Sequence, residues 1–243
     1  MNLGYEMAMA ATEFKCSVTS FKMLTPSVFE VCFATDKPMP FDAGQFISIV
    51  IPGAGPNGRD LRRAYSIASS PETNPVELCV KRVEEGPGTN FLYNLRFGDT
   101  FRGFAPYGDF IYEKHEKRHV YFIATGTGIA PFRSMIQSGK YKAHPPKTLT
   151  CLLGVRTEDE LVYDADFSIP GIDWIKTVSQ PRHESYEGYR GRVTDWFRER
   201  GEDFPWLEGE YYLCGNGDMI KEVVSILTEK GVLPDSIHKE KYY

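Results

Sequence analysis

The sequence lacks any cysteine spacing that is typical of a metal centre. Its five cysteines are scattered along 243 residues, at Cys16, Cys32, Cys79, Cys151 and Cys214. No two of them form the C-x-x-C of a zinc site or the longer C-x4-C-x2-C spacing of a plant-type iron–sulfur cluster. We therefore expect reduced thiols in a cytoplasmic protein that binds no metal.

Long apolar runs, a basic N-terminus and an excess of positive charge are missing as well. No stretch approaches the roughly 18 consecutive apolar residues of a membrane helix. Residues 1–12 contain no Lys or Arg, which argues against a secretory signal. The net charge of −5 gives no electrostatic reason to expect nucleic acid as a partner. We expect a monomer that binds neither membrane nor nucleic acid.

The first half of the chain has the pattern of a small antiparallel β-barrel or sandwich. Short apolar or alternating runs are separated by Gly, Pro, Asn and Asp, which favour turns. Strands are expected at residues 14–22, 28–34, 45–51, 63–68, 76–83, 100–104 and 110–112. One helix is expected at residues 90–95, with Thr89 as its N-cap.

The second half alternates strands with helices, which predicts a parallel sheet covered on both faces. Strands are expected at residues 119–124, 148–153, 173–178, 210–213 and 237–240. Helices are expected from Pro131, at 159–167, near 194–200, and at 218–230 with Asp218 as cap and Gly231 as stop. The change of pattern places a domain boundary near Glu116, between a domain of residues 10–115 and one of residues 116–243.

A possible ligand site begins with Arg63-Ala64-Tyr65-Ser66, on one of the expected strands. Side chains two apart on a strand share a face, so Arg63 and Tyr65 lie on the same side. A guanidinium beside a flat ring suits a ligand with a phosphate group and a planar heterocycle. An edge arginine next to a half-buried tyrosine is an equally good account of these four residues alone.

Two glycine turns lead into expected helices. Gly126-Thr127-Gly128 follows the first strand of the second half, with Pro131 at the helix start, and Gly86-Pro87-Gly88-Thr89-Asn90 lies in the first half. The N-terminus of a helix behind such a turn binds pyrophosphate through its N–H groups and its dipole. Each turn taken alone is equally compatible with a structural role.

Together these motifs resemble the ferredoxin–NADP reductase superfamily over nearly the whole chain. Residues 63–66 are similar to its R-x-Y-S flavin motif, and residues 86–89 to its flavin pyrophosphate turn. Residues 106–110 are similar to its G-P-x-G-x-F segment, with Ala105 replacing the glycine. Residues 126–131 are similar to its nicotinamide-nucleotide turn, and residues 213–216 to its C-G-x motif.

The resemblance implies a flavin-binding antiparallel β-barrel followed by an α/β nucleotide-binding domain, with FAD as cofactor and NAD(P)H as co-substrate. Arg63 would pair with the flavin pyrophosphate, Tyr65 would stack on the isoalloxazine, and Ser66 would hydrogen-bond near N5. The other implied flavin contacts are Ala64, Cys79, Val80, Lys81, Arg82, Gly86, Gly88, Thr89 and Asn90. The implied nicotinamide-nucleotide contacts are Gly126, Thr127, Gly128, Val155, Arg156, Ser179, Gln180, Arg192, Cys214, Gly215, Asn216 and Asp218.

The resemblance also implies that Tyr65, Ser66, Cys214 and Tyr243 act at the point of hydride transfer. Tyr242 and Tyr243 are similar to the aromatic ending that covers the flavin until nicotinamide displaces it. A buried strand-end role for Cys214 and a frayed tail for the last residues remain open. The protein would hold nicotinamide against flavin and perform no acid–base chemistry of its own.

Coenzyme choice stays open in the sequence. Family members that select NADP often carry Ser-Arg after the third strand, where this chain has Ser179-Gln180. Nearby Arg156, Arg182, Arg190 and Arg192 are possible substitutes for the missing arginine, although each is also compatible with a solvated surface charge.

The resemblance therefore implies an FAD-dependent NAD(P)H reductase that passes single electrons to a ferredoxin, a flavodoxin or an oxygenase component, or that runs in reverse. Three alternatives remain. These are a flavin or quinone reductase, an electron-transfer subunit of a larger complex, and a nucleotide-binding module without redox turnover.

Overall fold

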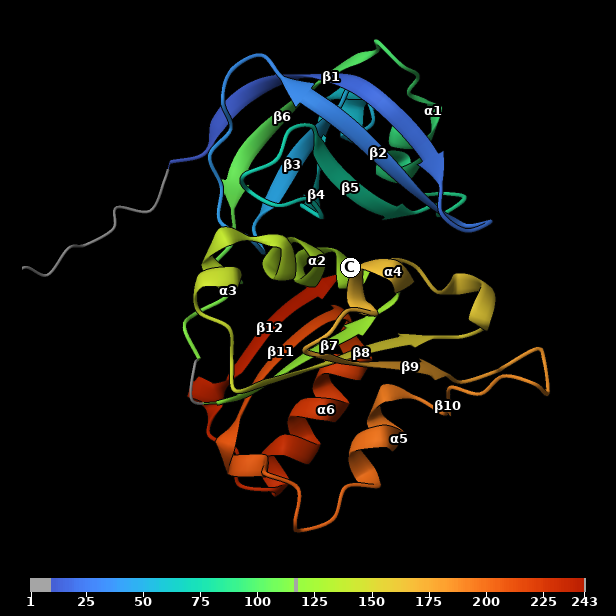
Figure 1. The fold of residues 1–243 in the computed structure, drawn as a ribbon. Coiled ribbons are helices and arrows are strands. Elements are labelled where there is room, and N and C mark those ends of the chain that lie inside the picture. The colour runs from blue at the N-terminus through green and yellow to red at the C-terminus, as the bar shows by residue number, and fades with distance from the viewer. Residues whose placement is uncertain (1–9, 116–117, 243) are drawn as a thin grey trace, which may run out of the picture.

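The chain forms two domains, one above the other in Figure 1. The computed structural model describes residues 10–115 and 118–242, so the predicted boundary at Glu116 lies outside the described residues. The upper domain is an antiparallel sheet, and the lower domain is a parallel sheet with helices on both faces. The predicted fold class is confirmed. None of the helices in the described part of the chain is long and apolar enough to cross a membrane.

The first domain is a curled sheet in the strand order β4-β3-β6-β1-β2-β5, with every pair antiparallel. A bridge between Ile67 and Leu78 joins its two edges, which brings the sheet close to a closed barrel. Alternate residues Phe14, Cys16 and Val18 point inward, as the period of a strand requires. The elements are β1 (Thr12–Met23), β2 (Val28–Thr35), β3 (Phe46–Ile51), η1 (Pro56–Gly58), β4 (Leu61–Ser66), β5 (Val76–Lys81), α1 (Pro87–Asn94) and β6 (Thr100–Tyr107).

The second domain is a parallel sheet in the order β10-β9-β8-β7-β11-β12. Its strands are β7 (His119–Thr125), β8 (Thr148–Val155), β9 (Ile172–Val178), β10 (Tyr189–Arg190), β11 (Gly209–Asn216) and β12 (Ile237–Tyr242). Its helices are η2 (Gly126–Ile129), α2 (Ala130–Gln137), α3 (Gly139–Ala143), η3 (Glu158–Glu160), α4 (Asp164–Phe167), α5 (Val193–Arg198), η4 (Trp206–Glu208), α6 (Gly217–Glu229) and η5 (Pro234–Ser236).

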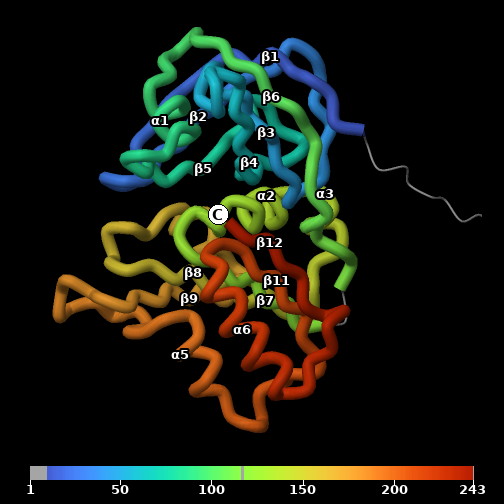
Figure 2. The backbone as a smooth tube through the Cα atoms, turned by 180° about the vertical axis from the view of Figure 1, so that it is seen from behind, coloured from blue at the N-terminus to red at the C-terminus, as the bar shows by residue number. Residues whose placement is uncertain are grey.

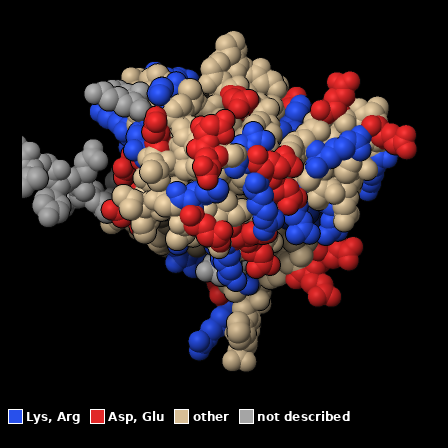
Figure 3. Space-filling view, turned by 90° about the horizontal axis from the view of Figure 1, so that it is seen from below, with Lys and Arg blue, Asp and Glu red and all other residues tan. Residues whose placement is uncertain are grey.

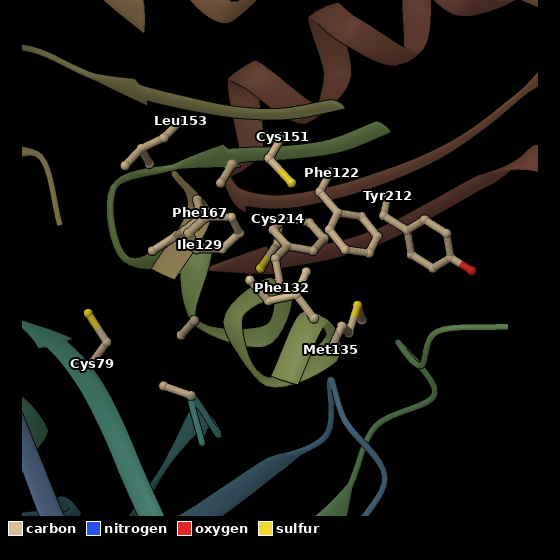
Figure 4. Close-up of a cluster of buried hydrophobic side chains, with 14 of the residues drawn as sticks. Cys79, Phe122, Ile129, Phe132, Met135, Cys151, Leu153, Phe167, Tyr212 and Cys214 are labelled. Atoms are coloured by element: carbon tan, nitrogen blue, oxygen red, sulfur yellow. The ribbon is translucent and has the colours of Figure 1, made fainter. Parts of the chain in front are cut away.

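Alternation along β7 explains how both faces of this sheet become buried. Phe122 faces α2, where its ring stacks on Phe132 with 4.7 Å between centroids. Figure 4 shows these two rings side by side, with Cys214 and Tyr212 of β11 next to them. Tyr121 and Ile123 face the other way, toward α5 and α6. Strands buried on both faces read as continuous apolar runs, as this sequence does.

Three details of the predicted secondary structure are wrong. Residues 110–112 form no strand in the described chain, because Phe110 and Tyr112 bury their rings in the core of the second domain, beside Phe122 and Tyr212. Helix α1 starts at Pro87 with Gly86 as N-cap, so Thr89 lies inside the helix. The predicted helix at residues 159–167 is two short turns, because Tyr163 adopts a left-handed conformation (φ 59°) between them.

Helix α6 is capped differently from the prediction. The side chain of Asn216, rather than Asp218, is the N-cap and accepts hydrogen bonds from the backbone N–H groups of Asp218 and Met219. Gly231 follows the helix with φ +82°, a conformation that glycine adopts without a Cβ penalty. The two-residue strand β10 was not predicted, since it is too short to show a period.

Helix α2 lies between the two domains (Figures 1 and 2). Its residue Arg133 contacts groups of both domains. The guanidinium donates to the carbonyl of Ala68 at 3.1 Å and pairs with Glu77 of the first domain. It also pairs with Asp166 at 3.2 Å and lies 4.5 Å from the ring centroid of Tyr163, both in the second domain. One half-buried cation therefore holds groups from both sides of the domain interface.

Charges of both signs are interspersed on the face of the second domain that is farthest from the first (Figure 3). A surface that binds nucleic acid would need a continuous patch or stripe of positive charge. This face does not carry one.

Candidate functional site

A cavity of about 760 Å³ lies where the two domains meet. Ligand sites in proteins have volumes of about 300–1,000 Å³, so this one suits a cofactor-sized molecule. Most of its lining comes from β4, β5 and α1, with further residues from β3 and the loop before α1, and four residues come from the second domain. The lining residues are Phe46, Arg63, Ala64, Tyr65, Ser66, Cys79, Val80, Lys81, Val83, Gly86, Pro87, Gly88, Thr89, Thr127, Glu240, Lys241 and Tyr242.

Strand β4 brings Arg63, Tyr65 and Ser66 to this cavity. The strand is the edge of its sheet and pairs only with β3, opposite Ile49, Ile47 and Phe46. Burial raises the pKa of Tyr65 to about 12, and the positive charge of Arg63 opposes this shift. At neutral pH Tyr65 is therefore an uncharged phenol, whose ring offers a flat apolar surface beside a guanidinium.

The turn before α1 is packed directly against this pair. A Cβ at Gly88 would overlap the hydroxyl of Tyr65 and lie 3.0 Å from Cγ of Arg63. The hydroxyl of Thr89 donates to the carbonyls of Val83 and Gly86 at 3.2 and 3.1 Å, which fixes the shape of the turn. The backbone N–H groups at the start of α1 thus lie next to a guanidinium and an aromatic ring. This donor set fits a flavin dinucleotide, whose pyrophosphate needs N–H and guanidinium donors and whose ring needs a stacking partner.

The strand β12 closes the cavity from the second domain. The hydroxyl of Ser66 donates to Oε1 of Glu240 at 2.7 Å, a contact between residues 174 positions apart. Cys214 pairs in register with Glu240, and Tyr242 follows two residues later on the same face. Burial raises the pKa of Glu240, against the effect of the Ser66 hydrogen bond. Burial also raises the pKa of Cys214 well above its ordinary value, so the thiol is protonated at neutral pH.

The glycine turn after β7 lies at the carboxyl edge of the parallel sheet. Gly126 has φ +53°, and a Cβ at Gly128 would overlap the carbonyl of Cys214. The backbone N–H of Asn216 donates to Oγ1 of Thr125 at 2.9 Å, which ties the ends of β7 and β11 together. The chain order of the sheet reverses at β7, between β8 and β11. Open α/β sheets bind nucleotides at such a switch point.

The ends of β8 and β9 form the outer part of this edge. The N–H of Ser179 donates to the carbonyl of Val155 at 3.2 Å, and that of Gln180 to the carbonyl of Arg156 at 2.8 Å. Arg156, Ser179, Gln180 and Arg192 are exposed. These four predicted site residues therefore lie at one end of the sheet, outside the cavity.

Two other arginines near this edge are already engaged. Arg182 pairs with Asp159 at 2.6 Å, and Arg190 donates to the carbonyls of His183, Glu184 and Tyr186. Their guanidinium groups contact their own chain, whereas those of Arg156 and Arg192 make no ion pair or side-chain hydrogen bond with the described residues.

Twelve of the residues named from the sequence line the cavity, and others do not reach it. The guanidinium of Arg82 lies 3.9 Å from the ring centroid of Tyr93, and the amide of Asn90 donates to the carbonyl of Glu84. Asp218 is exposed in the first turn of α6, and Tyr243 lies outside the described residues.

Sequence reasoning missed Glu240, together with Phe46, Val83, Pro87 and Lys241. The period of a strand points to Glu240, because Tyr242 is a predicted site residue and residues two apart share a face.

Comparisons with known proteins identify both domains. The oxidoreductase FAD-binding domain family matches residues 15–112, and the oxidoreductase NAD-binding domain family matches residues 122–225. The chain is 32% identical to ferredoxin–NADP reductase B of Sorangium cellulosum, over 96% of this chain and 98% of that protein.

Other matches extend to longer proteins. The chain is 29% identical to the phenol hydroxylase P5 protein of Acinetobacter pittii, over 95% of this chain but 65% of that protein. The crystal structure of a cytochrome P450 reductase from Amycolatopsis superposes with a TM-score of 0.84 at 27% identity, over 97% of this chain and 71% of that one. The match along the whole Sorangium protein, with both family assignments, shows that the chain belongs to the ferredoxin–NADP reductase superfamily and is an oxidoreductase with an FAD-binding and an NAD-binding domain.

Proposed function

We propose that the protein is an FAD-dependent reductase that accepts a hydride from NAD(P)H and delivers single electrons to a separate protein carrier. The observation that carries this proposal is the cavity between the domains, which combines the Arg63–Tyr65 pair and the Gly88 turn with Thr127, Glu240 and Tyr242. Such a cavity would bring a flavin site of one domain next to a nucleotide site of the other. The carrier is a ferredoxin, a flavodoxin or an oxygenase component, in line with the names of the relatives.

Bound FAD would supply the chemistry, because it accepts a hydride and releases electrons one at a time. The residues of this chain would bind and orient it. Arg63 and the N–H groups of residues 86–89 would hold the pyrophosphate, and the ring of Tyr65 would carry the flavin ring. The turn at Gly126 and Gly128 would hold the pyrophosphate of the nicotinamide nucleotide.

Ser66 and Glu240 would set the polarity where the two ligands meet. Their hydrogen bond crosses the domain interface inside the cavity, so it fixes the position of β12 relative to β4. The protonated thiol of Cys214 lies behind it and adds no charge. Pre-orientation of this kind lowers the barrier by avoiding reorganisation at the moment of reaction.

We propose NADPH as the preferred coenzyme, bound through Arg156 and Arg192. Both arginines are exposed at the strand ends where the ribose of a nucleotide would lie. Arg182 and Arg190 do not compete for this role because their guanidinium groups are engaged by Asp159 and by backbone carbonyls.

Anaerobic stopped-flow reduction tests this proposal. The purified protein reconstituted with FAD should lose flavin absorbance on mixing with NADPH, and more slowly with NADH. Reduced protein should then pass electrons to ferredoxin or flavodoxin faster than to free flavin or quinone. A protein that takes up no FAD would overturn the flavoenzyme proposal. Fast turnover with free flavin or quinone, and none with a protein carrier, would favour the flavin or quinone reductase instead.

A further inference from the structure

Two histidines and a glutamate cluster outside the cavity, at the beginning of β11 and β12. The candidate ligand atoms of His115, Glu210 and His238 all lie within 4.8 Å of one another. His115 belongs to the segment that precedes β7, whereas Glu210 and His238 are each the second residue of a strand. The three positions are far apart in the sequence, so no spacing motif announces them.

The spacing of one pair already matches that of two ligands on a single metal ion. Nε2 of His238 lies 3.3 Å from Oε2 of Glu210. Zinc binds nitrogen and oxygen at about 2.0–2.1 Å in a tetrahedron, which separates neighbouring ligand atoms by about 3.3 Å. No pair of candidate ligand atoms in the cluster is more than 4.8 Å apart, so a small adjustment of the side chains would bring the third ligand to the same separation.

The three side chains are held in place by partners that surround the cluster. The ring of His238 stacks on Tyr212 with 4.2 Å between centroids, and the hydroxyl of Tyr212 lies 2.7 Å from Nε2 of His115. Figure 4 shows this hydroxyl pointing away from the buried rings around Phe122. The Tyr212 hydroxyl also accepts the backbone N–H of Glu113 at 3.2 Å, and when it accepts Nε2–H of a neutral His115 as well, the Nδ1 lone pair of His115 is left for a metal ion. Histidine ligands are oriented in this way in known metal sites.

The glutamate is oriented through its other oxygen. Oε1 of Glu210 lies 3.3 Å from both the guanidinium of Arg118 and the hydroxyl of Ser236, and Oε2 is the oxygen that faces His238. Arg118 also donates to the carbonyl of Gly209 at 2.8 Å. Its charge is thus fixed on the side of the carboxylate away from His238.

Burial and ligand type decide the kind of ion. The side chains of Glu210 and His238 are 12% and 25% exposed, so the cluster is shielded yet reachable from solvent on the His238 side. Two imidazoles and one carboxylate suit zinc-class ions, whereas calcium and magnesium prefer oxygen ligands only. We propose that His115, Glu210 and His238 bind one Zn²⁺, with water in the fourth position, and thereby tie the segment before β7 to β11 and β12. The competing account is a set of hydrogen bonds that holds no ion.

Zinc binding to the FAD-loaded, chelator-treated full chain tests the proposal. Equilibrium dialysis with elemental analysis should give one Zn²⁺ per chain. His115→Gln, Glu210→Gln and His238→Gln should each weaken binding by about 100-fold or more, beyond the roughly 10–100-fold expected for the outer partner in Tyr212→Phe. His119→Gln is the matched control, because His119 also lies beside a glutamate, Glu208 at 3.6 Å, but has no second histidine there. It should leave zinc affinity unchanged.

A measurement on the unmodified chain avoids any folding defect in the variants. Imidazole ¹⁵N shifts recorded during a zinc titration should move for His115 and His238 and stay fixed for His119, His144 and His183. Absence of stoichiometric zinc in the wild-type protein would overturn the proposal. So would unchanged affinity in folded Glu210→Gln and His238→Gln, or zinc-dependent shifts at the other three histidines only.

Discussion

Replacement of Arg133 by alanine should separate the unfolding of the two domains. The guanidinium pairs with Glu77 of the first domain and Asp166 of the second, and its side chain is 14% exposed. Removing one partner of a buried ion pair costs about 3–5 kcal/mol, because the other charge is left without compensation. Glu77 and Asp166 are 25% and 27% exposed, so water recovers part of this cost. We expect Arg133→Ala to lower the free energy of unfolding by about 2–4 kcal/mol.

Urea titration with two probes measures this effect. All three tryptophans, Trp174, Trp196 and Trp206, lie in the second domain, so their fluorescence reports on that domain alone. Far-UV circular dichroism reports on both domains. The two curves should coincide in the wild type and separate in Arg133→Ala.

Arg102 provides a matched control for Arg133. It also pairs with two carboxylates, Glu13 and Asp60, but its side chain is 53% exposed and all three residues lie in the first domain. Arg102→Ala should cost less than about 1 kcal/mol and leave the two curves together. Equal losses in the two variants, or coincident curves in Arg133→Ala, would refute the idea that burial at the domain interface sets the value of this cation.

Three further predictions concern the cavity and the nucleotide edge. Gly88→Ala should lower FAD affinity at least tenfold, because the new methyl group overlaps Tyr65 and Arg63. Gly98→Ala, outside the cavity, should leave FAD affinity unchanged. Fluorescence titration with FAD measures both affinities. Arg156→Gln should raise KM for NADPH about tenfold and leave KM for NADH nearly unchanged, because only NADPH carries a 2′-phosphate for the guanidinium to hold. Equal effects on both coenzymes in steady-state kinetics would contradict this role of Arg156. Burial raises the pKa of Glu240 above its ordinary value of 4.5, so the stabilisation of the neutral carboxyl is full below that value and is lost as pH rises through the raised pKa. Glu240→Gln is always neutral and should therefore gain stability relative to the wild type as the pH rises above 4.5 and through the raised pKa of Glu240. A difference in melting temperature that does not change with pH would exclude this cause.

The fold was predictable because its two patterns are local. Alternation in β1 and the continuous apolar run of β7 each follow from which faces of a strand become buried. The errors arise where tertiary contacts replace a local partner. The alternation of apolar residues at Phe110 and Tyr112 predicts a strand. Their rings are instead buried in the core of the second domain, and their backbone joins no sheet among the described residues.

Of the residues that line the cavity, mainly those in short sequence motifs were predictable. Arg63, Tyr65 and Gly88 occur in short motifs, because a phosphate turn and a stacking ring need fixed local spacing. Glu240 belongs to no motif: the period of the strand puts it on the same face as Tyr242, but its contact with Ser66, 174 residues away, depends on the pairing of β12 with β11. The His115 cluster depends on the same pairing and was missed for the same reason.

The edge strand β12 therefore contributes residues both to the cavity of the proposed function and to the proposed zinc site. His238 lies at its beginning, and Glu240 and Tyr242 lie at its end, all on one face. An edge strand has a neighbour on one side only, so its position depends on β11 and on side-chain contacts. Ser66 holds the end of β12 inside the cavity, and a zinc ion on His238 would hold its beginning against the segment before β7. Because both contacts bind the second domain to residues of the first domain or of the segment between them, each would limit how far the two nucleotide sites can separate.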